Sequence, residues 1–267
     1  MNFKTVTILL SILLASTAIQ NVSEFLFPKA HSASMTSLEK LPDFTTYKNI
    51  KKKKEAFFAT LYPIIEEENK RVLITRGAIH ELKTMPITTL NDQQTTWLLN
   101  LAQRYKLYDA SIDENFFDNL LRRVDYIPPS LALSQAAIES GWGTSRFSKI
   151  GNNIFGQWCF TIGCGIVPKS RESGKTHEVA KFDTVNQAVR GYILNLNSNA
   201  SFNKLRQKRA SLRENNQSIT GIALAKTLAK YSGEGTRYID KLTQFINQNK
   251  LQRFNKTVGA PLSASIK

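Results

Sequence analysis

The chain has 267 residues, 42% of them hydrophobic, so it can bury a core, and its composition excludes a protein that is disordered throughout. Its 36 Lys and Arg outweigh 21 Asp and Glu to give a formal net charge of +15, which indicates an acidic partner. Nucleic acid suits this charge in a cytosolic protein, whereas anionic lipids and acidic envelope polymers suit it in an exported one.

Residues 1–20 have the pattern of a secretory signal. They combine Lys4 with an apolar stretch from Val6 to Ile19 and contain no acidic residue. A membrane-spanning helix needs about 20 apolar residues, and this stretch is shorter. We therefore interpret residues 1–32 as a signal peptide or a short anchor, and expect an exported protein of the periplasm or cell envelope.

Residues 33–110 are predicted to form a polar linker followed by a helical accessory segment. Apolar residues recur at the helical period over 57–65, where Pro63 is expected to kink the helix or restart it. Another helix is expected after Asn91, because Gln94 stands three residues later and the pair can form a capping box.

The helix after Pro128-Pro129 carries the most informative acidic residue. Ser130 is a good N-cap residue, and the helix is expected to end at Gly141. Glu139 then lies in the last turn, one turn after Gln135, where the helix dipole disfavours a negative charge. This position is expected to raise the pKa of the Glu139 carboxyl group.

Residues 151–182 change in pattern, with frequent glycines and two short strand-like stretches at 166–172 and 177–182. Gly174 lies between these stretches, so we expect a small β-hairpin lobe with this glycine in the turn. The sequence thus predicts a local switch from helices to a small sheet.

The C-terminal part is predicted to be helical again. Thr184 and Gln187 form a second potential capping box, helices are expected at about 219–231 and 236–249, and residues 251–267 are interpreted as a polar tail. Charge runs usually lie on solvated helix faces, and we expect this of two basic clusters: Lys51 to Lys54, and Arg206, Lys208, Arg209 and Arg213.

The two cysteines, Cys159 and Cys164, are predicted to form a disulfide in an oxidising compartment, with a reduced structural pair as the alternative. Two thiols are too few ligands for a structural zinc site. His31, His80 and His177 show no ligand spacing, so we predict no metal and no cofactor.

Glu139 stands among apolar and aromatic residues in the stretch 136–143, where glycines would let a long polymer approach the backbone. Glycoside hydrolysis needs a carboxylic acid that stays protonated near neutral pH. Desolvation first and the helix dipole second could provide one here. The alternative is a helix-terminal Glu without a catalytic role.

Two blocks of sequence carry a resemblance. Residues 134–143, Ser-Gln-Ala-Ala-Ile-Glu-Ser-Gly-Trp-Gly, are followed by residues 151–156, Gly-Asn-Asn-Ile-Phe-Gly. Together and in this order they resemble the signature of the glucosaminidases of glycoside hydrolase family 73, including the catalytic domain of flagellar FlgJ proteins. Glu-Ser-Gly alone is less specific, because soluble lytic transglycosylases share it. The resemblance places a glucosaminidase domain at 111–250, and the whole chain, including 45–69, is similar to the bacterial Bax subgroup.

This resemblance implies a mainly α (α+β), lysozyme-like helical domain with a small β-lobe, and a glycan cleft between them. Glu139 matches the general acid. The family places a second carboxylate before the hairpin turn, which favours Glu172 over Glu178, although either could be a solvated hairpin charge. The acetamido group of the substrate could also replace a second carboxylate.

Near the C-terminus, Tyr238 matches a family tyrosine that points into the cleft, with a core aromatic as the alternative. The loop before it, Ser-Gly-Glu-Gly-Thr, departs from the family pattern. Trp158 could stack on a sugar or cover the cysteine loop, whereas Trp142 is expected in the core. The remaining substrate-binding candidates from the matching motifs are Asn153, Phe155, Gly156, Tyr231 and Glu178.

The resemblance therefore predicts a monomeric endo-β-N-acetylglucosaminidase that acts on peptidoglycan glycan strands. Its charge could also favour other envelope polyanions, and we expect no nucleic acid as a partner. Two alternatives stay open: a lytic transglycosylase or muramidase-type enzyme that uses Glu139, and a non-catalytic basic protein that binds wall polymer or nucleic acid.

Overall fold

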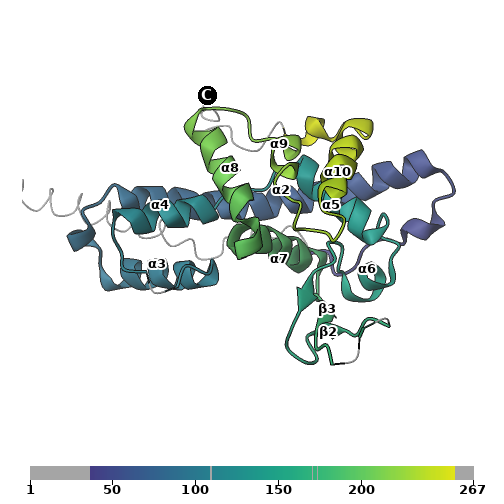
Figure 1. The fold of residues 1–267 in the computed structure, drawn as a ribbon, viewed down its shortest axis with the longest axis horizontal. Helices are drawn as coiled ribbons and strands as arrows, with labels where there is room; N and C mark the ends of the chain where they lie inside the picture. The colour runs from purple at the N-terminus through teal and green to yellow at the C-terminus, as the bar shows by residue number, and fades with distance from the viewer. Residues whose placement is uncertain (1–36, 109, 170, 173, 256–267) are drawn as a thin grey trace, which may run out of the picture.

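The computed structural model describes residues 37–108, 110–169, 171–172 and 174–255. The predicted leader at 1–32 and residues 256–267 of the predicted tail lie outside this part of the chain. The fold is mainly helical with one small sheet, which confirms the predicted fold class (Figure 1). Within the described residues, no helix combines the length and apolar character needed to cross a membrane.

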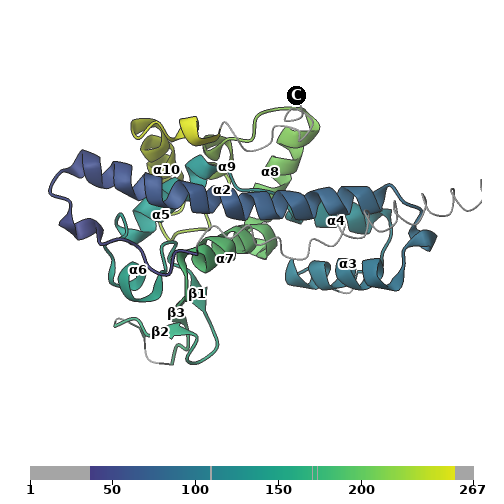
Figure 2. The same ribbon diagram turned by 180° about the vertical axis from the view of Figure 1, so that it is seen from behind.

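The long helix α2, Ile50–Lys83, runs along the molecule, as Figures 1 and 2 show from opposite sides. It follows the short 3-10 helix η1, Phe44–Thr46, and the side chain of Asn49 caps its first turn. Pro63 lies inside α2, and the predicted restart at this residue is wrong. Buried residues on both sides of Pro63 hold the helix in the core, which outweighs the backbone hydrogen bond that proline cannot make.

Two helices pack against the C-terminal half of α2: α3, Asp92–Arg104, and α4, Glu114–Arg123. The predicted capping box is confirmed, since Asn91 and Gln94 exchange side-chain and backbone hydrogen bonds of 2.9 and 3.0 Å. The apolar faces of α3 and α4 form a second, smaller core together with residues of α2 such as Ile79.

The central helix α5, Pro129–Ser140, is almost entirely buried. It begins at Pro129, so the prediction of Ser130 as its N-cap is wrong: proline suits the first helical position, and Ser130 falls inside the helix. The helix ends as predicted at Gly141, whose φ of 54° lies in the left-handed region. The short helix α6, Arg146–Gly151, follows.

The 3-10 helix η2, Ile87–Thr89, lies between α2 and α3. The C-terminal part of the described chain forms α7, Val185–Ser198; η3, Ala200–Phe202; α8, Asn203–Glu214; α9, Gly221–Ala225; α10, Thr236–Gln248; and η4, Leu251–Asn255. Thr184 caps α7 by accepting from the backbone of Gln187, as predicted, but the Gln187 side chain accepts from Asp183 instead. Helix α9 is shorter than expected. Leu251 is fully buried, so the assignment of 251–255 to a polar tail is wrong.

The sheet consists of β1, Trp158–Cys159, β2, Gly165–Ile166, and β3, Glu178–Ala180, antiparallel in the order β1-β3-β2. The predicted hairpin is present as β2 and β3, with Gly174 at a φ of 81° in the connection. β2 is shorter than expected, so Glu172 lies in the connecting segment and not on a strand. Pro168 offers no N–H to extend the ladder. We call residues 157–182 the β-lobe, which projects away from α8, α9 and α10 (Figure 1).

The segment before residue 111 contributes directly to the main core. Phe44, Phe57 and Leu61 are fully buried in the same cluster as residues of α5, α7 and α10. Glu68 of α2 also accepts two hydrogen bonds, of 2.8 and 2.9 Å, from Arg190 of α7. The expected accessory segment therefore packs into the same hydrophobic core as the region expected to be catalytic.

Part of the second basic cluster is buried, so the prediction of a solvated face is wrong for Arg206 and Arg209. Arg209 donates to backbone carbonyls of the last two residues of α4 and of the segment after it, including that of Tyr126 at 2.9 Å, and lies beside Asp125. Carbonyls at a helix end lack helical partners, and the guanidinium group provides donors for them. Arg213 also pairs with Asp125 at 2.6 Å.

Candidate active site

Glu139 lies in the last turn of α5, just before the left-handed residue Gly141, as predicted. Burial is the main cause that raises the pKa of its carboxyl group, and the charge of Glu234 adds a small rise. A hydrogen bond from Tyr238 and the charge of Lys241 lower the pKa, but burial prevails. The net direction favours the neutral acid, because a desolvated carboxylate is costly.

A directed chain of hydrogen bonds ends on this carboxyl group. The Tyr192 hydroxyl donates to Gln135 Oε1 at 2.7 Å, Gln135 Nε2 donates to the Tyr238 hydroxyl at 3.0 Å, and Tyr238 donates to Glu139 Oε1 at 2.7 Å. Gln135 is fully buried, so its amide has no water as an alternative partner. Each donor in the chain points towards Glu139, and Oε1 is therefore held in one position.

The other oxygen, Oε2, lies beside Gly156. A Cβ atom at Gly156 would be 3.7 Å from Glu139 Oε2, and the φ of 64° at this glycine disfavours other residues. Gly156 is exposed, so the backbone beside Oε2 is open to a ligand. The two carboxyl oxygens thus have different surroundings: one is fixed by a phenol, and one lies next to an exposed glycine.

Aromatic packing supports this arrangement. The rings of Tyr231 and Tyr238 stack at 5.6 Å, and those of Phe155 and Tyr192 stack at 3.9 Å. The Tyr231 hydroxyl donates to the carbonyl of Phe155 at 3.0 Å. Burial raises the pKa of all three tyrosines, which keeps their hydroxyl groups neutral as donors.

Asn153 and Phe155, two of the predicted substrate-binding residues, turn their side chains into the protein just before Gly156. Asn153 donates to the carbonyls of Gln157 and Ala180, both at 2.8 Å, and accepts from the N–H of Gln157 at 2.9 Å. Phe155 is 1% exposed. Both side chains are occupied by contacts inside the protein, and they hold the loop in place.

Glu178 has its carboxylate turned into the loop between the cysteines. It accepts hydrogen bonds from the backbone N–H groups of Gly163 and Gly165, at 3.1 and 2.8 Å, and these bonds lower its pKa. Cys159 and Cys164 form the predicted disulfide that closes this loop.

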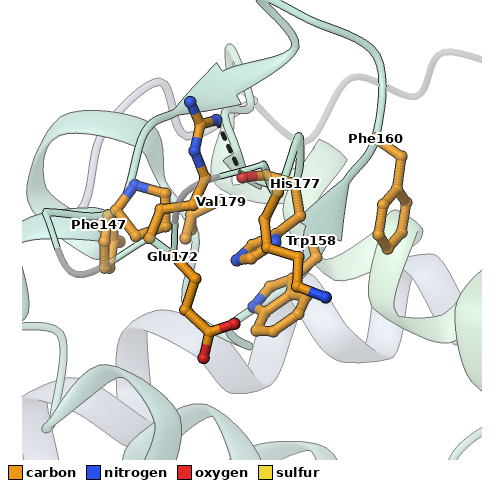
Figure 3. Close-up of a pocket in the computed structure, with 9 residues that line it drawn as sticks. Phe147, Trp158, Phe160, Glu172, His177 and Val179 are labelled. Carbon is orange, nitrogen blue, oxygen red and sulfur yellow. Dashed lines mark hydrogen bonds between the residues drawn. The ribbon is translucent and has the colours of Figure 1, made fainter.

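A cavity of about 680 Å³, which we call the β-lobe cavity, opens on the same lobe (Figure 3). Trp158 is 59% exposed there and stacks on His177 at 4.4 Å. The exposed Glu172 turns towards Trp158 in Figure 3, and Glu139 does not line this cavity. The lining residues are Phe147, Trp158, Phe160, Pro168, Arg171, Glu172, Lys175, His177 and Val179.

Trp142, which follows Glu139's helix, is partly buried and packs against the main core in which it was expected. Its ring lies 5.5 Å from Phe57, 5.4 Å from Phe58 and 5.2 Å from Phe245. The next residue, Gly143, leaves no room for a side chain, because a Cβ atom there would be 2.7 Å from Phe44. Helix α2 and η1 therefore support the turn that follows the acid.

The structure thus brings together Glu139, Gly156, Tyr231 and Tyr238, and places Glu172 and Trp158 at the β-lobe cavity. Gln135 and Tyr192 were not predicted to take part in the site. A long polar side chain inside a buried helix, one turn before the acid, was the signal available for Gln135. Tyr192 has the spacing of a core residue, and nothing local distinguishes its hydroxyl group.

A carboxylic acid kept neutral by burial is what a glycosidase needs as its general acid. Residues 114–251 match the model of the glucosaminidase family, described as mannosyl-glycoprotein endo-beta-N-acetylglucosaminidase. The chain is also 30% identical to Protein bax of Escherichia coli (strain K12) over 221 residues, which cover 82% of this chain and 78% of that protein. The chain belongs to the glucosaminidase family and is a glycoside hydrolase.

One solved structure was also similar. The catalytic domain of the autolysin Auto from Listeria monocytogenes is 19% identical, with a TM-score of 0.38, over 66% of this chain and 93% of that domain.

Proposed function

We propose that this protein is an endo-β-N-acetylglucosaminidase that cleaves the glycan strands of peptidoglycan between N-acetylglucosamine and N-acetylmuramic acid, with Glu139 as the general acid. The observation that carries the proposal is the asymmetric Glu139 carboxyl group. Its Oε1 accepts from Tyr238 at 2.7 Å, and its Oε2 lies beside the exposed Gly156. Family membership supports the reaction class.

The hydrogen bond from Tyr238 decides which oxygen holds the proton. Because Oε1 already receives the phenol hydrogen, the acid carries its own proton on Oε2, on the side of Gly156. The glycosidic oxygen takes this proton as its bond to the anomeric carbon breaks, and Glu139 becomes a carboxylate. The Tyr238 hydrogen bond stabilises that carboxylate, because hydrogen bonds to the charged form favour it.

The second catalytic group has two remaining candidates. We assign Glu178 a structural role, because two backbone N–H groups already occupy its carboxylate. Glu172 is exposed and free to activate water, whereas the acetamido group of the substrate could act in its place. Glu172→Gln separates them: a loss of about a hundredfold or more in kcat supports Glu172 as the base, and a small change supports the acetamido group.

The proposal is tested on purified wall glycan with Glu139→Gln. Removal of a general acid costs about a hundredfold to ten-thousandfold in turnover. Glu81→Gln, at an exposed position near the end of α2, is the matched control and should retain full activity. Equal activity of Glu139→Gln and the wild type would remove Glu139 from the mechanism.

The reaction products test the bond that is cut. Mass spectrometry should find free reducing N-acetylglucosamine ends. Anhydromuramyl ends would instead indicate a lytic transglycosylase, which needs a single acid.

We also propose that the enzyme acts outside the cytoplasm as a monomer and needs no cofactor. Its substrate lies in the envelope, and the first twenty residues have the pattern of an export signal. The net charge of +15 suits a wall polymer that bears peptide carboxylates. Fractionation of cells that produce the full chain tests this location.

A further inference from the structure

The β-lobe cavity is not needed to explain proton donation by Glu139, and its lining has a chemistry of its own. We propose that it is a subsite for the acidic stem peptide of peptidoglycan, so that the enzyme prefers glycan strands that carry peptides. This inference rests on the proposed function for its substrate.

Exposed aromatic rings provide the first argument. Trp158 is 59% exposed and Phe160 is 70% exposed, although burial of such rings is normally favourable. Large apolar side chains gathered around a cavity are typical of ligand-binding surfaces. The ring of His177 covers one face of Trp158, and both rings line the cavity.

Charge provides the second argument. Arg171 and Lys175 line the cavity together with the single acid Glu172, so cationic side chains outnumber anionic ones. Lys175 is exposed and makes no ion pair with the described residues. A ligand with apolar groups and carboxylates matches this lining. A peptide with several acidic groups offers both, whereas an uncharged sugar offers no partner for Lys175.

The cavity is also built on a fixed frame. The disulfide closes the loop that carries Phe160, and Glu178 binds the backbone N–H groups of Gly163 in this loop and of Gly165 directly after it. Arg171 donates to the carbonyl of His177 at 3.4 Å, the dashed line in Figure 3. A frame held in this way loses little conformational entropy on binding.

The position of the cavity connects it with the acid. Trp158 follows Gly156 by two residues, and Gly156 lies beside Oε2 of Glu139. Two residues span at most about 7 Å, so the backbone of Trp158 lies no farther than this from the backbone at Gly156. A muramyl residue bound near Glu139 would therefore bring its peptide within reach of the lobe.

The test compares kcat/KM on two glycans of equal length, one with intact stem peptides and one stripped of them by an amidase. We expect Lys175→Glu to lower the ratio of the two values, peptide-bearing over stripped, by about three- to tenfold. A surface ion pair changes affinity by up to about fivefold, and charge reversal adds repulsion. The decrease should shrink at high salt, which screens exposed charges.

Lys169→Glu is the matched control, since Lys169 is an exposed lysine of the same lobe that does not line the cavity. It should leave the ratio unchanged. An unchanged ratio in Lys175→Glu, or an equal decrease in Lys169→Glu, would overturn the proposal. So would binding to anionic lipid vesicles that depends on Lys175 while the ratio stays constant.

Failure of the proposed function gives a different result. If the wild type cleaves neither glycan, the enzyme assignment fails, and calorimetry with a soluble muramyl peptide decides the subsite alone. Weaker binding to Lys175→Glu than to the wild type and Lys169→Glu supports the subsite, and equal binding to all three rejects it.

Discussion

Replacement of Tyr238 by Phe isolates the hydrogen bond that ends on the acid. The variant keeps the ring that stacks on Tyr231 and removes the hydroxyl group that donates to Glu139 at 2.7 Å. A hydrogen bond to a charged group is worth about 1.5–3 kcal/mol. The same bond to the neutral acid is worth about 0.5–1.5 kcal/mol, so its loss costs the charged form about 1–1.5 kcal/mol more. The protonation equilibrium of Glu139 should therefore shift by roughly five- to tenfold towards the neutral acid, since 1.36 kcal/mol corresponds to tenfold.

The direction of the pKa change at Glu139 follows from the hydrogen bond that Tyr238 donates. Tyr238 donates to the ionised carboxylate and lowers the pKa of Glu139, so its removal raises that pKa. The limb of the pH profile at which activity falls as the general acid ionises should move to higher pH. The maximal rate should fall, because Oε1 is no longer held and the carboxylate product loses its donor.

The same variant should also be less stable. Gln135 Nε2 loses the oxygen to which it donates at 3.0 Å, and the Gln135 side chain is fully buried. An unsatisfied buried donor costs about 1–3 kcal/mol, measurable as a lower midpoint in urea.

The assay is the pH dependence of kcat/KM on soluble glycan fragments, with Tyr231→Phe as the control. The Tyr231 hydroxyl donates to the carbonyl of Phe155 and not to Glu139, so its loss should leave the limb in place. A limb that stays in place or moves to lower pH in Tyr238→Phe would refute the reasoning, as would an equal shift in the control.

Three further predictions concern stability. The pKa of Glu139 is raised in the folded state, so the wild type should lose stability as pH rises through that pKa; Glu139→Gln should melt higher than the wild type at pH 7–8 and lose this advantage near pH 4. Equal melting curves at both pH values would contradict this. Gly143→Ala should cost about 2–5 kcal/mol in urea unfolding, because its φ of 74° adds backbone strain and its Cβ would be 2.7 Å from Phe44; Gly233→Ala, with open space around it, should cost far less. Reduction of the disulfide should cost about 2 kcal/mol, as expected for a small closed loop, and a calorimetric scan with and without reductant measures it.

Features that depend on a few neighbouring residues were predictable from the sequence. These include the end of α5 at Gly141, the capping box of Asn91 and Gln94, and the position of Glu139 in the last helical turn. Each follows from backbone donors and acceptors that must be satisfied within about one turn. The signature blocks likewise pointed to the glucosaminidase family, which the family match then confirmed.

Local patterns were less informative where packing overrides them. Pro63 normally ends a helix, yet α2 continues through it. Arg209 belongs to a basic run that is typical of a solvated face, yet its guanidinium group is buried against backbone carbonyl groups more than eighty residues away in the sequence. In both cases, contacts with distant residues provide the compensating free energy.

The sequence by itself determined the mainly helical class, the small hairpin and the acid at a helix end. The helical period, the turn glycines and the capping residues depend only on residues close together in the sequence. Only the tertiary structure decided the state of the acid and its neighbours. Tyr238 and Glu139 are 99 residues apart, and Tyr192 reaches Gln135 across 57 residues. The direction of a buried hydroxyl group, or of the Glu178 carboxylate, depends on which donors the folded chain brings within hydrogen-bond distance, and no local pattern records that.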